Sequence, residues 1–470
     1  MNFTTRRSFL QLAAWGAAAA TLFDRPVLWG EALAAGRKVR AWVTGGNQRF
    51  AEIDAPEWQP SSAADHDIQI HPSVRRQSML GFGAAFTDAS CYLISQLPDS
   101  ERRRLLEEFF GPEGLHFSVG RACIGASDYS RNAYSYDDSA DPELKNFSIA
   151  HDTAYILPTL TAARSLNPDL FLFASPWSPP GWMKTGGSLM GGSMRKEFFA
   201  VYAEYFVKFL EAYRQAGVRI EAVTVQNEVD TDQNGKMPAC LWGQEYEAEF
   251  IKSYLGPALK HASLDTRIWI LDHNFDLWGR VMDELSDPAL SRYVDGVAWH
   301  GYAGEPDAMT RVHDAFPEKN AYWTEGGPDF TSPDYATDWA KWSDTFTDVL
   351  RNWGRCAMGW NLALDEQGKP NIGPFNCGGL VTIDSHSRQI TRSGQYWAFA
   401  HFSKAIRPGA IVLESSGQTG SLGHVALENP DGSRVLILTN RGEASTVRCR
   451  LNDRMLEIRV PRDTVATFTW

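Results

Sequence analysis

The chain has 470 residues, and its 45 lysines and arginines against 57 aspartates and glutamates give a formal net charge of −12 at pH 7. This acidic balance argues against a nucleic-acid-binding protein, which needs a basic surface. Hydrophobic residues make up 43% of the chain and charged residues 22%, values typical of soluble globular proteins. A mainly disordered, collagen-like or multi-span membrane chain is therefore excluded, and the length allows two or more domains.

The first residues have the pattern of an export signal. Arg6-Arg7 is followed by an uncharged, alanine-rich run over residues 12–23 and by small residues suited to cleavage at 32–34. The apolar run is too short for a membrane-spanning helix, which needs about 20 residues. Residues 1–34 are therefore predicted to be a twin-arginine signal peptide. We expect a periplasmic or secreted protein with no stable membrane insertion after cleavage; an uncleaved membrane anchor or a buried helix is the alternative.

Six cysteines are spread along the chain, with no C-x-x-C pair and no histidine spacing that fits zinc. They are predicted mainly as buried thiols, because a chain of this length can build a sufficient core without disulfides. They are Cys91, Cys123, Cys240, Cys356, Cys377 and Cys449.

Both ends of the chain have the alternating apolar and polar pattern of strands. Residues 39–53 alternate, and residues 425–439 read as a hairpin with its turn at residues 429–432. Three more short strands are predicted at 445–450, 455–460 and 465–470. Because the N-terminal strands have no partners nearby in sequence, we expect residues 35–75 and 401–470 to form one β-sandwich.

Between these ends, residues 76–400 alternate short apolar runs with amphipathic helices, the pattern of repeated βα units. One helix is predicted over 195–216, with Gly217 ending it. Eight runs predict a (β/α)8 barrel whose active site lies at the carboxyl ends of the strands. A doubly wound open sheet is the alternative, although no G-x-G-x-x-G follows the first run. The runs are 80–86, 117–124, 170–175, 220–225, 267–271, 297–300, 321–324 and 356–361.

Two glutamates follow the fourth and seventh runs, where a barrel would place them at its mouth. Asn227-Glu228 ends one run and Glu325 ends the other. Glycoside hydrolysis needs such a pair, because one carboxyl group protonates the leaving oxygen while the other attacks the anomeric carbon or activates a water. Each glutamate alone would more simply be a solvated surface charge, but the pair at two strand ends favours catalysis.

The other predicted strand ends carry aromatic and polar side chains suited to a neutral sugar. Aromatic rings stack on the apolar faces of sugar rings, and polar groups hydrogen-bond the hydroxyls. The candidates are Arg121, Asp128, Trp177, His300, Tyr302 and Trp360.

Asp272, His273 and His300 are candidate metal ligands, because histidines and carboxylates at the ends of barrel strands can hold zinc. No tight ligand pattern such as H-x-H or H-E-x-x-H is present, so we expect no metal and no cofactor.

Five motifs together resemble glycoside hydrolase family 30, in the branch that contains lysosomal glucosylceramidase and the β-1,6-glucanases. They are GFGAAFTD (81–88), RACIGASDYS (121–130), ASPWSPPGWMKT (174–185), QNE (226–228) and GWNLALDEQGKPN (359–371). The resemblance implies a (β/α)8 barrel with a side β-sandwich built from both chain ends.

The resemblance also implies roles for the candidate residues in a retaining mechanism. Glu228 would be the general acid/base and Glu325 the nucleophile, with Glu228 protonated and Glu325 ionised near neutral pH. Asn227 would hold the sugar 2-hydroxyl. The remaining roles would be distal-hydroxyl binding by Asp128 and Trp177, stacking by Trp360, and orientation of the nucleophile by Arg121, His300 and Tyr302.

Two departures from the family pattern stand near the site. Gly326-Gly327 follows Glu325 where glucosylceramidases usually have Ala-Cys, and Lys369 replaces a glycine before Pro370-Asn371. We expect a retaining β-glucosidase acting on β-glucosides or short β-glucans. An endo-β-1,6-glucanase is the alternative within the class, and a non-catalytic carbohydrate-binding protein is the alternative outside it.

Overall fold

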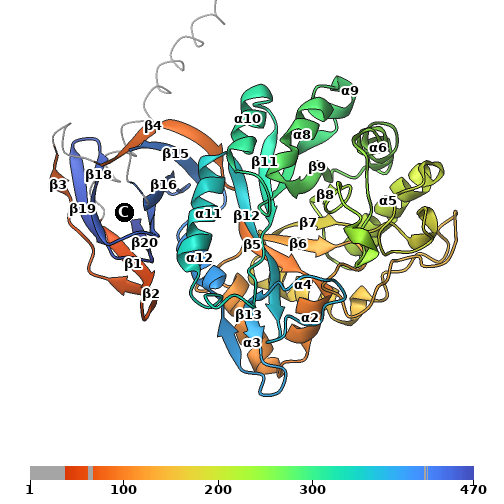
Figure 1. The fold of residues 1–470 in the computed structure, drawn as a ribbon, viewed down its shortest axis with the longest axis horizontal. Helices are drawn as coiled ribbons and strands as arrows, with labels where there is room; N and C mark the ends of the chain where they lie inside the picture. Colours follow the sequence, from red (N-terminus) through yellow and green to blue (C-terminus); the bar gives the residue numbers. More distant parts are fainter. Residues whose placement is uncertain (1–37, 62–66, 418–419, 421) are drawn as a thin grey trace, which may run out of the picture.

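The structure is a computed structural model that describes residues 38–61, 67–417, 420 and 422–470, in two units side by side (Figure 1). The larger unit is a barrel of parallel strands surrounded by helices, and the smaller unit is a β-sandwich. The predicted signal peptide, residues 1–34, lies outside the described residues.

Eight parallel strands close the barrel and correspond one to one with the eight predicted apolar runs. The last strand pairs with both the seventh and the first, which completes the ring. This closure confirms the (β/α)8 barrel and excludes the doubly wound sheet. The strands are β5 (Gly81–Phe86), β6 (Val119–Cys123), β7 (Phe171–Ser175), β8 (Ala222–Thr224), β9 (Arg267–Asn274), β10 (Val294–His300), β11 (Asn320–Glu325) and β12 (Gly354–Leu364).

Bulky side chains fill the barrel interior, so it is a packed core and not a channel. The rings of Trp269 and Tyr322 stack with centroids 3.9 Å apart, and Phe173 packs on Trp269 at 4.9 Å. Further along the strands the buried side chains become polar: Asp272 is fully enclosed there, and Glu325 is buried except for a small exposed part. The packed layer thus forms an apolar floor beneath a polar mouth.

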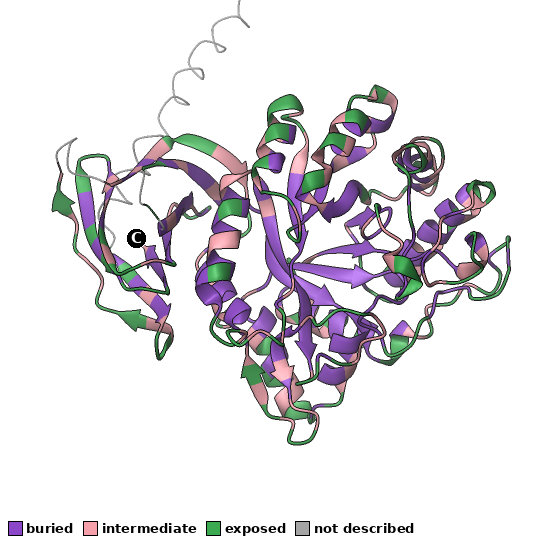
Figure 2. Cartoon of the chain, in the orientation of Figure 1, coloured by how far each residue is buried: buried purple, intermediate pink, exposed green. Residues whose placement is uncertain are grey.

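Helices cover the outside of the barrel and turn their apolar faces towards it (Figures 1 and 2). In the predicted helix over 195–216, the buried Tyr202, Phe206 and Phe209 recur at three- and four-residue steps, and Gly217 follows in a left-handed conformation (φ 82°). The α-helices are α2 (Asp88–Ser95), α3 (Asp99–Phe110), α4 (Ile156–Leu166), α5 (Phe199–Gln215), α6 (Gln244–Phe250), α7 (Gly256–His261), α8 (Trp278–Leu285), α9 (Pro288–Ser291), α10 (Asp307–Ala315), α11 (Trp339–Arg351) and α12 (Gly394–Ser403). A π-helical segment, Ile251–Leu255, joins α6 to α7, and 3-10 turns occur at Asp152–Ala154, Gly181–Met183, Lys196–Phe198, Gln233–Gly235 and Phe275–Leu277.

The apolar runs did not predict a short extension beside β12. Strand β13 (Gly379–Ile383) pairs parallel with the end of β12, and β14 (Ile390–Arg392) pairs antiparallel with β13. The loop that precedes β13, residues 365–378, returns towards the mouth of the barrel and contributes to the pocket described below.

Strands from both chain ends form the sandwich in a single curled sheet, as predicted. Its order is β2-β1-β20-β17-β16-β15-β4-β18-β19-β3, and β1 pairs antiparallel with the last strand of the chain, β20. In β18 the buried Val447, Cys449 and Leu451 alternate with half-buried arginines, which is why this strand has one face in the core. The strands are β1 (Arg40–Gly45), β2 (Gln48–Ile53), β3 (Gln59–Pro60), β4 (Ile68–Ser78), β15 (Ile411–Ser416), β16 (Leu422–Glu428), β17 (Arg434–Asn440), β18 (Ser445–Leu451), β19 (Arg454–Val460) and β20 (Thr464–Thr469).

Helices α11 and α12 lie between the barrel and the sandwich and make hydrogen bonds across the interface (Figure 1). His401 on α12 is buried, and its two ring nitrogens each lie 2.8 Å from a threonine hydroxyl, Thr44 on β1 and Thr467 on β20. Ser343 on α11 lies 2.6 Å from the hydroxyl of Thr439 on β17. These paired polar groups fix the sandwich against the barrel at defined points.

All six cysteines are free thiols; five are buried and Cys377 is partly exposed. Within the described ranges, none of the helices combines the length and apolar composition needed to cross a bilayer.

The buried His401 makes the stability of the interface depend on pH. Burial lowers the pKa of His401 from 6.5 to about 3, so the unfolded chain takes up a proton at this residue at a higher pH than the folded chain does. We therefore expect the free energy of unfolding to fall as the pH drops from 6.5 towards 3, and to fall less steeply in His401→Gln. Urea unfolding across this range measures the difference, with His386→Gln, on an exposed loop, as the control. Parallel curves for parent and His401→Gln would contradict the expectation.

Candidate active site

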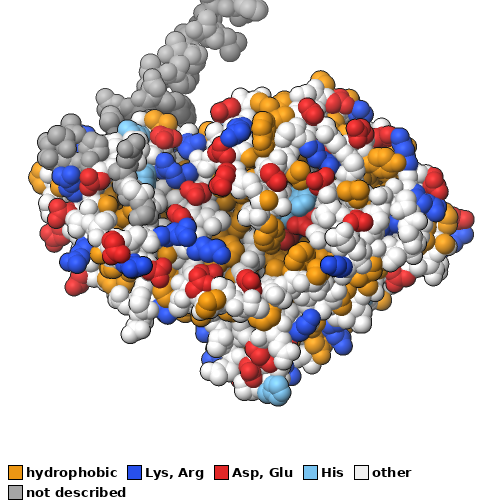
Figure 3. Space-filling view, in the orientation of Figure 1, with side chains coloured by type: hydrophobic (Ala, Val, Ile, Leu, Met, Phe, Trp, Pro, Cys, Tyr) orange, Lys and Arg blue, Asp and Glu red, His pale blue; other side chains and the backbone are white. Residues whose placement is uncertain are grey.

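A pocket of about 410 Å³ opens at the carboxyl ends of the barrel strands. Figure 3 shows acidic and histidine side chains close together in a recess bordered by hydrophobic side chains. Seven of the nine predicted site residues line the pocket, and Arg121 and His300 lie buried behind it. The lining consists of Asp128, Trp177, Asn227, Glu228, Thr231, Gln233, Met237, His273, Asn274, Tyr302, Glu325, Trp360, Phe375 and Cys377.

The two predicted catalytic glutamates lie on either side of one imidazole ring. Glu228 follows β8, and its Oε1 is 3.4 Å from Nδ1 of His300. Glu325 is the last residue of β11, and its Oε2 is 3.8 Å from Nε2 of the same ring. The barrel therefore brings the two carboxyl groups into one pocket, although 97 residues separate them in the sequence.

Arg121 anchors the site from below. Its guanidinium group is fully buried and forms an ion pair with Glu325, a 2.7 Å ion pair with Asp272 and a 2.8 Å hydrogen bond to Oδ1 of Asn227. It also donates to the hydroxyl of Ser175 at 3.2 Å. One cation thus fixes side chains from the ends of four other strands.

Asp272 is central to this network, but its structural role was missed from the sequence. It directly follows the fifth apolar run, 267–271, but the sequence singled it out only as a possible metal ligand. Its carboxylate contacts Arg121, His300 and the hydroxyls of Thr224 and Thr324 at 2.7–3.0 Å. Burial alone would raise the pKa of Asp272, but the charge of Arg121 and the hydrogen bond from His300 hold it well below its ordinary value.

Charges around His300 shift the titration of the whole site. Burial opposes protonation of His300, but the carboxylates of Glu325, Asp272 and Glu228 raise its pKa to about 9. Burial acts to raise the pKa of Glu228, yet hydrogen bonding and charge from His300 lower it overall. Burial raises the pKa of Glu325 against the opposing charges of His300 and Arg121.

The expectation that Glu228 is protonated in the free site is not supported, because hydrogen bonding and charge from His300, which lies closer to Glu228 than to Glu325, lower the pKa of Glu228. The upward direction of the pKa of Glu325 comes from burial and does not contradict the expectation that Glu325 is ionised near neutral pH. The sequence places His300 at a strand end but does not show which carboxylate it faces.

Of the residues predicted to bind sugar, all except Arg121 and His300 line the pocket. Trp177 and Trp360 stack on each other with ring centroids 4.8 Å apart. Oδ1 of Asp128 is buried and has no hydrogen-bond partner among the described residues, so it can accept a hydrogen bond from a ligand hydroxyl. The hydroxyl of Tyr302 donates to Oε1 of Glu325 at 3.0 Å.

Several pocket residues come from loops and were not anticipated. Gln233, after β8, donates to Oε2 of Glu228 at 2.8 Å, while Phe375 and Cys377 come from the loop before β13. Loops carry no apolar periodicity, so the sequence offered no signal for them. Lys369, in the same loop, is exposed and does not line the pocket.

The glycine after the candidate nucleophile has a packing reason. A Cβ at Gly326 would overlap the ring of Trp323, so only glycine fits this close approach. The packing of Trp323 behind Glu325 therefore explains why this chain has glycine where glucosylceramidases usually have alanine.

The comparisons with known proteins cover nearly the whole described chain. The sequence model of the glycosyl hydrolase family 30 TIM-barrel domain matches residues 79–406, and that of the family 30 β-sandwich domain matches residues 409–468. The chain is 36% identical to an endo-1,6-beta-D-glucanase of Neurospora crassa over 425 residues, which is 84% of this chain and 86% of that protein. It is 31% identical to the lysosomal acid glucosylceramidase of Mus musculus, over 86% of this chain and 83% of that protein. The solved structure of an endo-beta1,6-glucanase superposes with a TM-score of 0.84 at 29% identity, over 92% of this chain and all of that one.

Removing the buried cation should leave two carboxylates unpaired. We expect Arg121→Ala to lower the free energy of unfolding by about 3–5 kcal/mol, because Asp272 and Glu325 lose their buried partner. Urea unfolding measures the loss, and Arg40→Ala, which removes an exposed ion pair with Glu52, should change stability little. In a double-mutant cycle, Arg121→Ala should cost much less once Asp272 is also alanine; additive losses would show that the pair is not coupled.

Proposed function

The chain belongs to glycoside hydrolase family 30, and from this premise we propose that it is a retaining enzyme that cleaves the β-1,6 linkages of a glucan. The observation that carries the proposal is the arrangement of Glu228 and Glu325 on either side of His300 in one pocket. Two carboxyl groups facing one bound sugar are what glycosidic cleavage requires.

In the first step, a carboxylate oxygen of Glu325 attacks the anomeric carbon and forms a covalent glycosyl ester. At the same time Glu228 donates a proton to the glycosidic oxygen, and the bond between that oxygen and the anomeric carbon breaks. In the second step Glu228 takes a proton from a water, which attacks the anomeric carbon and releases Glu325. The two inversions retain the configuration.

The hydrogen bonds around Glu325 suit a nucleophile. Tyr302 donates to one oxygen and Arg121 to the other, so the carboxylate is held in a single orientation. Asn227, also held by Arg121, lies beside Glu228 in the pocket and is placed to bond the sugar 2-hydroxyl. These contacts can strengthen as charge develops on the sugar.

The proton for the leaving group is held by the pair of His300 and Glu228. In the free site it lies on His300, whose Nδ1 faces Oε1 of Glu228. A substrate that fills the pocket excludes water and presents the glycosidic oxygen to Glu228, which favours the neutral acid. We therefore propose that binding shifts the proton from His300 to Glu228.

Two features support a polymeric β-1,6-glucan as the substrate. The Neurospora crassa protein and the solved endo-beta1,6-glucanase carry that activity in their names and match this chain over most of its length. Two aromatic side chains of the pocket are exposed, Tyr302 by 47% and Phe375 by 43%, and can stack on further sugar units. The likeness to glucosylceramidase supports a second candidate, a β-glucosidase that removes single glucose units.

We further propose that the protein is exported and acts outside the cytoplasm. The Arg6-Arg7 motif and the apolar run that follows support export.

The substrate assignment predicts which compounds the purified protein cleaves. A polymeric β-1,6-glucan should give oligosaccharides whose newly released ends keep the β configuration, observed by NMR at early times. Glu325→Gln should abolish turnover while sugar binding persists, and Glu228→Gln should reduce turnover by about 10²- to 10⁴-fold. Glu305→Gln, an exposed glutamate, is the control. Release of glucose from aryl β-glucosides with no attack on polymer would instead support the second candidate, and normal turnover in Glu325→Gln would contradict the site.

The sharing of a proton between His300 and Glu228 predicts how activity falls at high pH. The high-pH fall in kcat/KM, its alkaline limb, reports an apparent pKa of this pair, so we expect kcat/KM to decrease as the pH rises towards 9. In His300→Asn only Glu228 can hold the proton, and we expect the limb to move to lower pH by more than about one unit. His386→Asn should leave the limb in place. An unmoved limb in His300→Asn would show that the pair does not hold the catalytic proton.

A further inference from the structure

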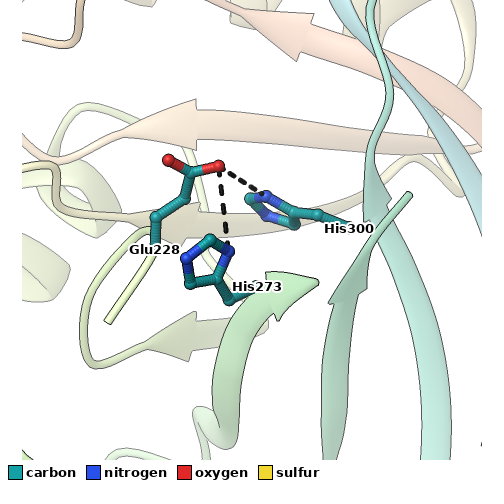
Figure 4. A group of neighbouring side chains, drawn as sticks. All are labelled: Glu228, His273 and His300. Atoms are coloured by element: carbon teal, nitrogen blue, oxygen red, sulfur yellow. Dashed lines mark hydrogen bonds and ion pairs between the residues drawn. The ribbon is translucent and has the colours of Figure 1, made fainter. Parts of the chain in front are cut away.

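Three side chains at the mouth of the barrel present metal-ligating atoms to one point (Figure 4). Oε1 of Glu228 lies 3.4 Å from Nδ1 of His300 and 3.9 Å from Nδ1 of His273. The three ligand atoms all lie within 4.8 Å of one another. The residues stand at the ends of the neighbouring strands β8, β9 and β10, so the barrel itself positions them.

His273 supplies an unused ligand atom. The residue is 8% exposed, and its Nδ1 is buried without a hydrogen-bond partner among the described residues. Buried polar atoms of this kind are uncommon, because leaving them unpaired costs free energy. Its position beside Glu228 leaves a ring nitrogen available to a ligand in the pocket.

The neighbours of His300 and Glu228 prepare the other two ligands. Nε2 of His300 lies 3.0 Å from Oδ1 of Asp272, the carboxylate–histidine contact that orients metal-binding imidazoles and directs the other ring nitrogen to the ion. Gln233 donates to Oε2 of Glu228, which leaves Oε1 facing the two histidines. Each ligand is therefore oriented by a contact outside the cluster.

We propose that Glu228, His273 and His300 bind a zinc-type transition-metal ion that inhibits the enzyme. Two imidazole nitrogens and one carboxylate oxygen are a common zinc ligand set, and they do not suit Mg²⁺ or Ca²⁺, which prefer oxygen ligands. Metal–ligand bonds of about 2 Å put tetrahedral ligands roughly 3.3 Å apart, so the two pairs with Glu228 are close to that spacing and no pair, all being within 4.8 Å, needs to close by more than about 1.5 Å. The ion takes the place of the proton between His300 and Glu228, and its fourth position faces the pocket.

The inhibition follows from the oxygen that the ion occupies. Oε1 of Glu228 would be coordinated and could no longer carry a proton to the glycosidic oxygen. The inhibition therefore rests on the proposed role of Glu228, whereas the binding of the ion does not.

Calorimetric titration of the metal-free full chain with Zn²⁺ tests the binding without any substrate. We expect one ion per chain, no binding of Mg²⁺, and an affinity at least about tenfold lower in His273→Asn. His261→Asn, an exposed histidine on α7, is the matched control and should bind as the parent does. Equal affinity in parent and His273→Asn, or equal binding of Zn²⁺ and Mg²⁺, would overturn the site.

Two further measurements keep the result independent of folding and of the proposed activity. Anomalous diffraction from a zinc-soaked crystal should place the ion between the three side chains, and an ion found only elsewhere would overturn the proposal even if His273→Asn failed to fold. On β-1,6-glucan, Zn²⁺ should inhibit the parent and inhibit His273→Asn at least tenfold more weakly. If zinc binds at the three side chains and turnover is undiminished, the proposed inhibition is overturned but the metal site is not. If the metal-free enzyme cleaves no β-glucoside, the result counts against the proposed function and not against the metal site.

Discussion

One buried guanidinium group determines the geometry of the active site. Arg121 reaches Glu325, Asp272 and Asn227, which come from different strands; Arg121 and Asp272 are fully buried, whereas Glu325 and Asn227 also line the pocket. Its planar array of donors can satisfy several oxygens at fixed angles, which a lysine ammonium cannot do. The alignment of the barrel strands and the orientation of the candidate nucleophile therefore depend on the same side chain, so fold and function are coupled at this position.

His300 links the two glutamates electrostatically as well as spatially. A histidine between carboxylates holds a proton at pH values where an isolated imidazole would lose it, and in doing so it lowers the pKa of the nearest carboxyl. Protonation in this glycoside hydrolase is thus a property of the pair and not of either residue. The same carboxylate oxygen and imidazole nitrogen that share a proton in the free site can also bind a metal ion, together with the ring nitrogen of His273. A proton and a metal ion both bind to atoms that carry a free lone pair.

The sequence predicted what depends on chain-wide periodicity, and missed what depends on loops and on side-chain orientation. The eight barrel strands, the sandwich from both chain ends and seven pocket-lining residues follow from apolar runs and the polar residues after them. Gln233 and Phe375 lie in loops, which have no apolar periodicity, and β13 and β14 lie outside the eight repeated βα units that the pattern predicts. The protonation of Glu228 was predicted wrongly because it depends on which nitrogen of His300 faces which carboxylate, and that is set only by packing.

Two non-glycine residues with left-handed backbone meet where the candidate acid/base contacts its support. Glu228 has φ 55° and Asp272 has φ 47°, the left-handed region that costs a non-glycine residue about 1–3 kcal/mol. The amide of Glu228 donates to the carbonyl of Asp272 at 2.9 Å, so the two strained residues hold each other in place. A relaxed backbone at either residue would turn its carboxyl group away from His300. The stability of the packed barrel therefore maintains a local backbone conformation that the peptide would not adopt by itself. This conformation keeps the carboxyl group of Glu228 next to His300 and in the same pocket as Glu325.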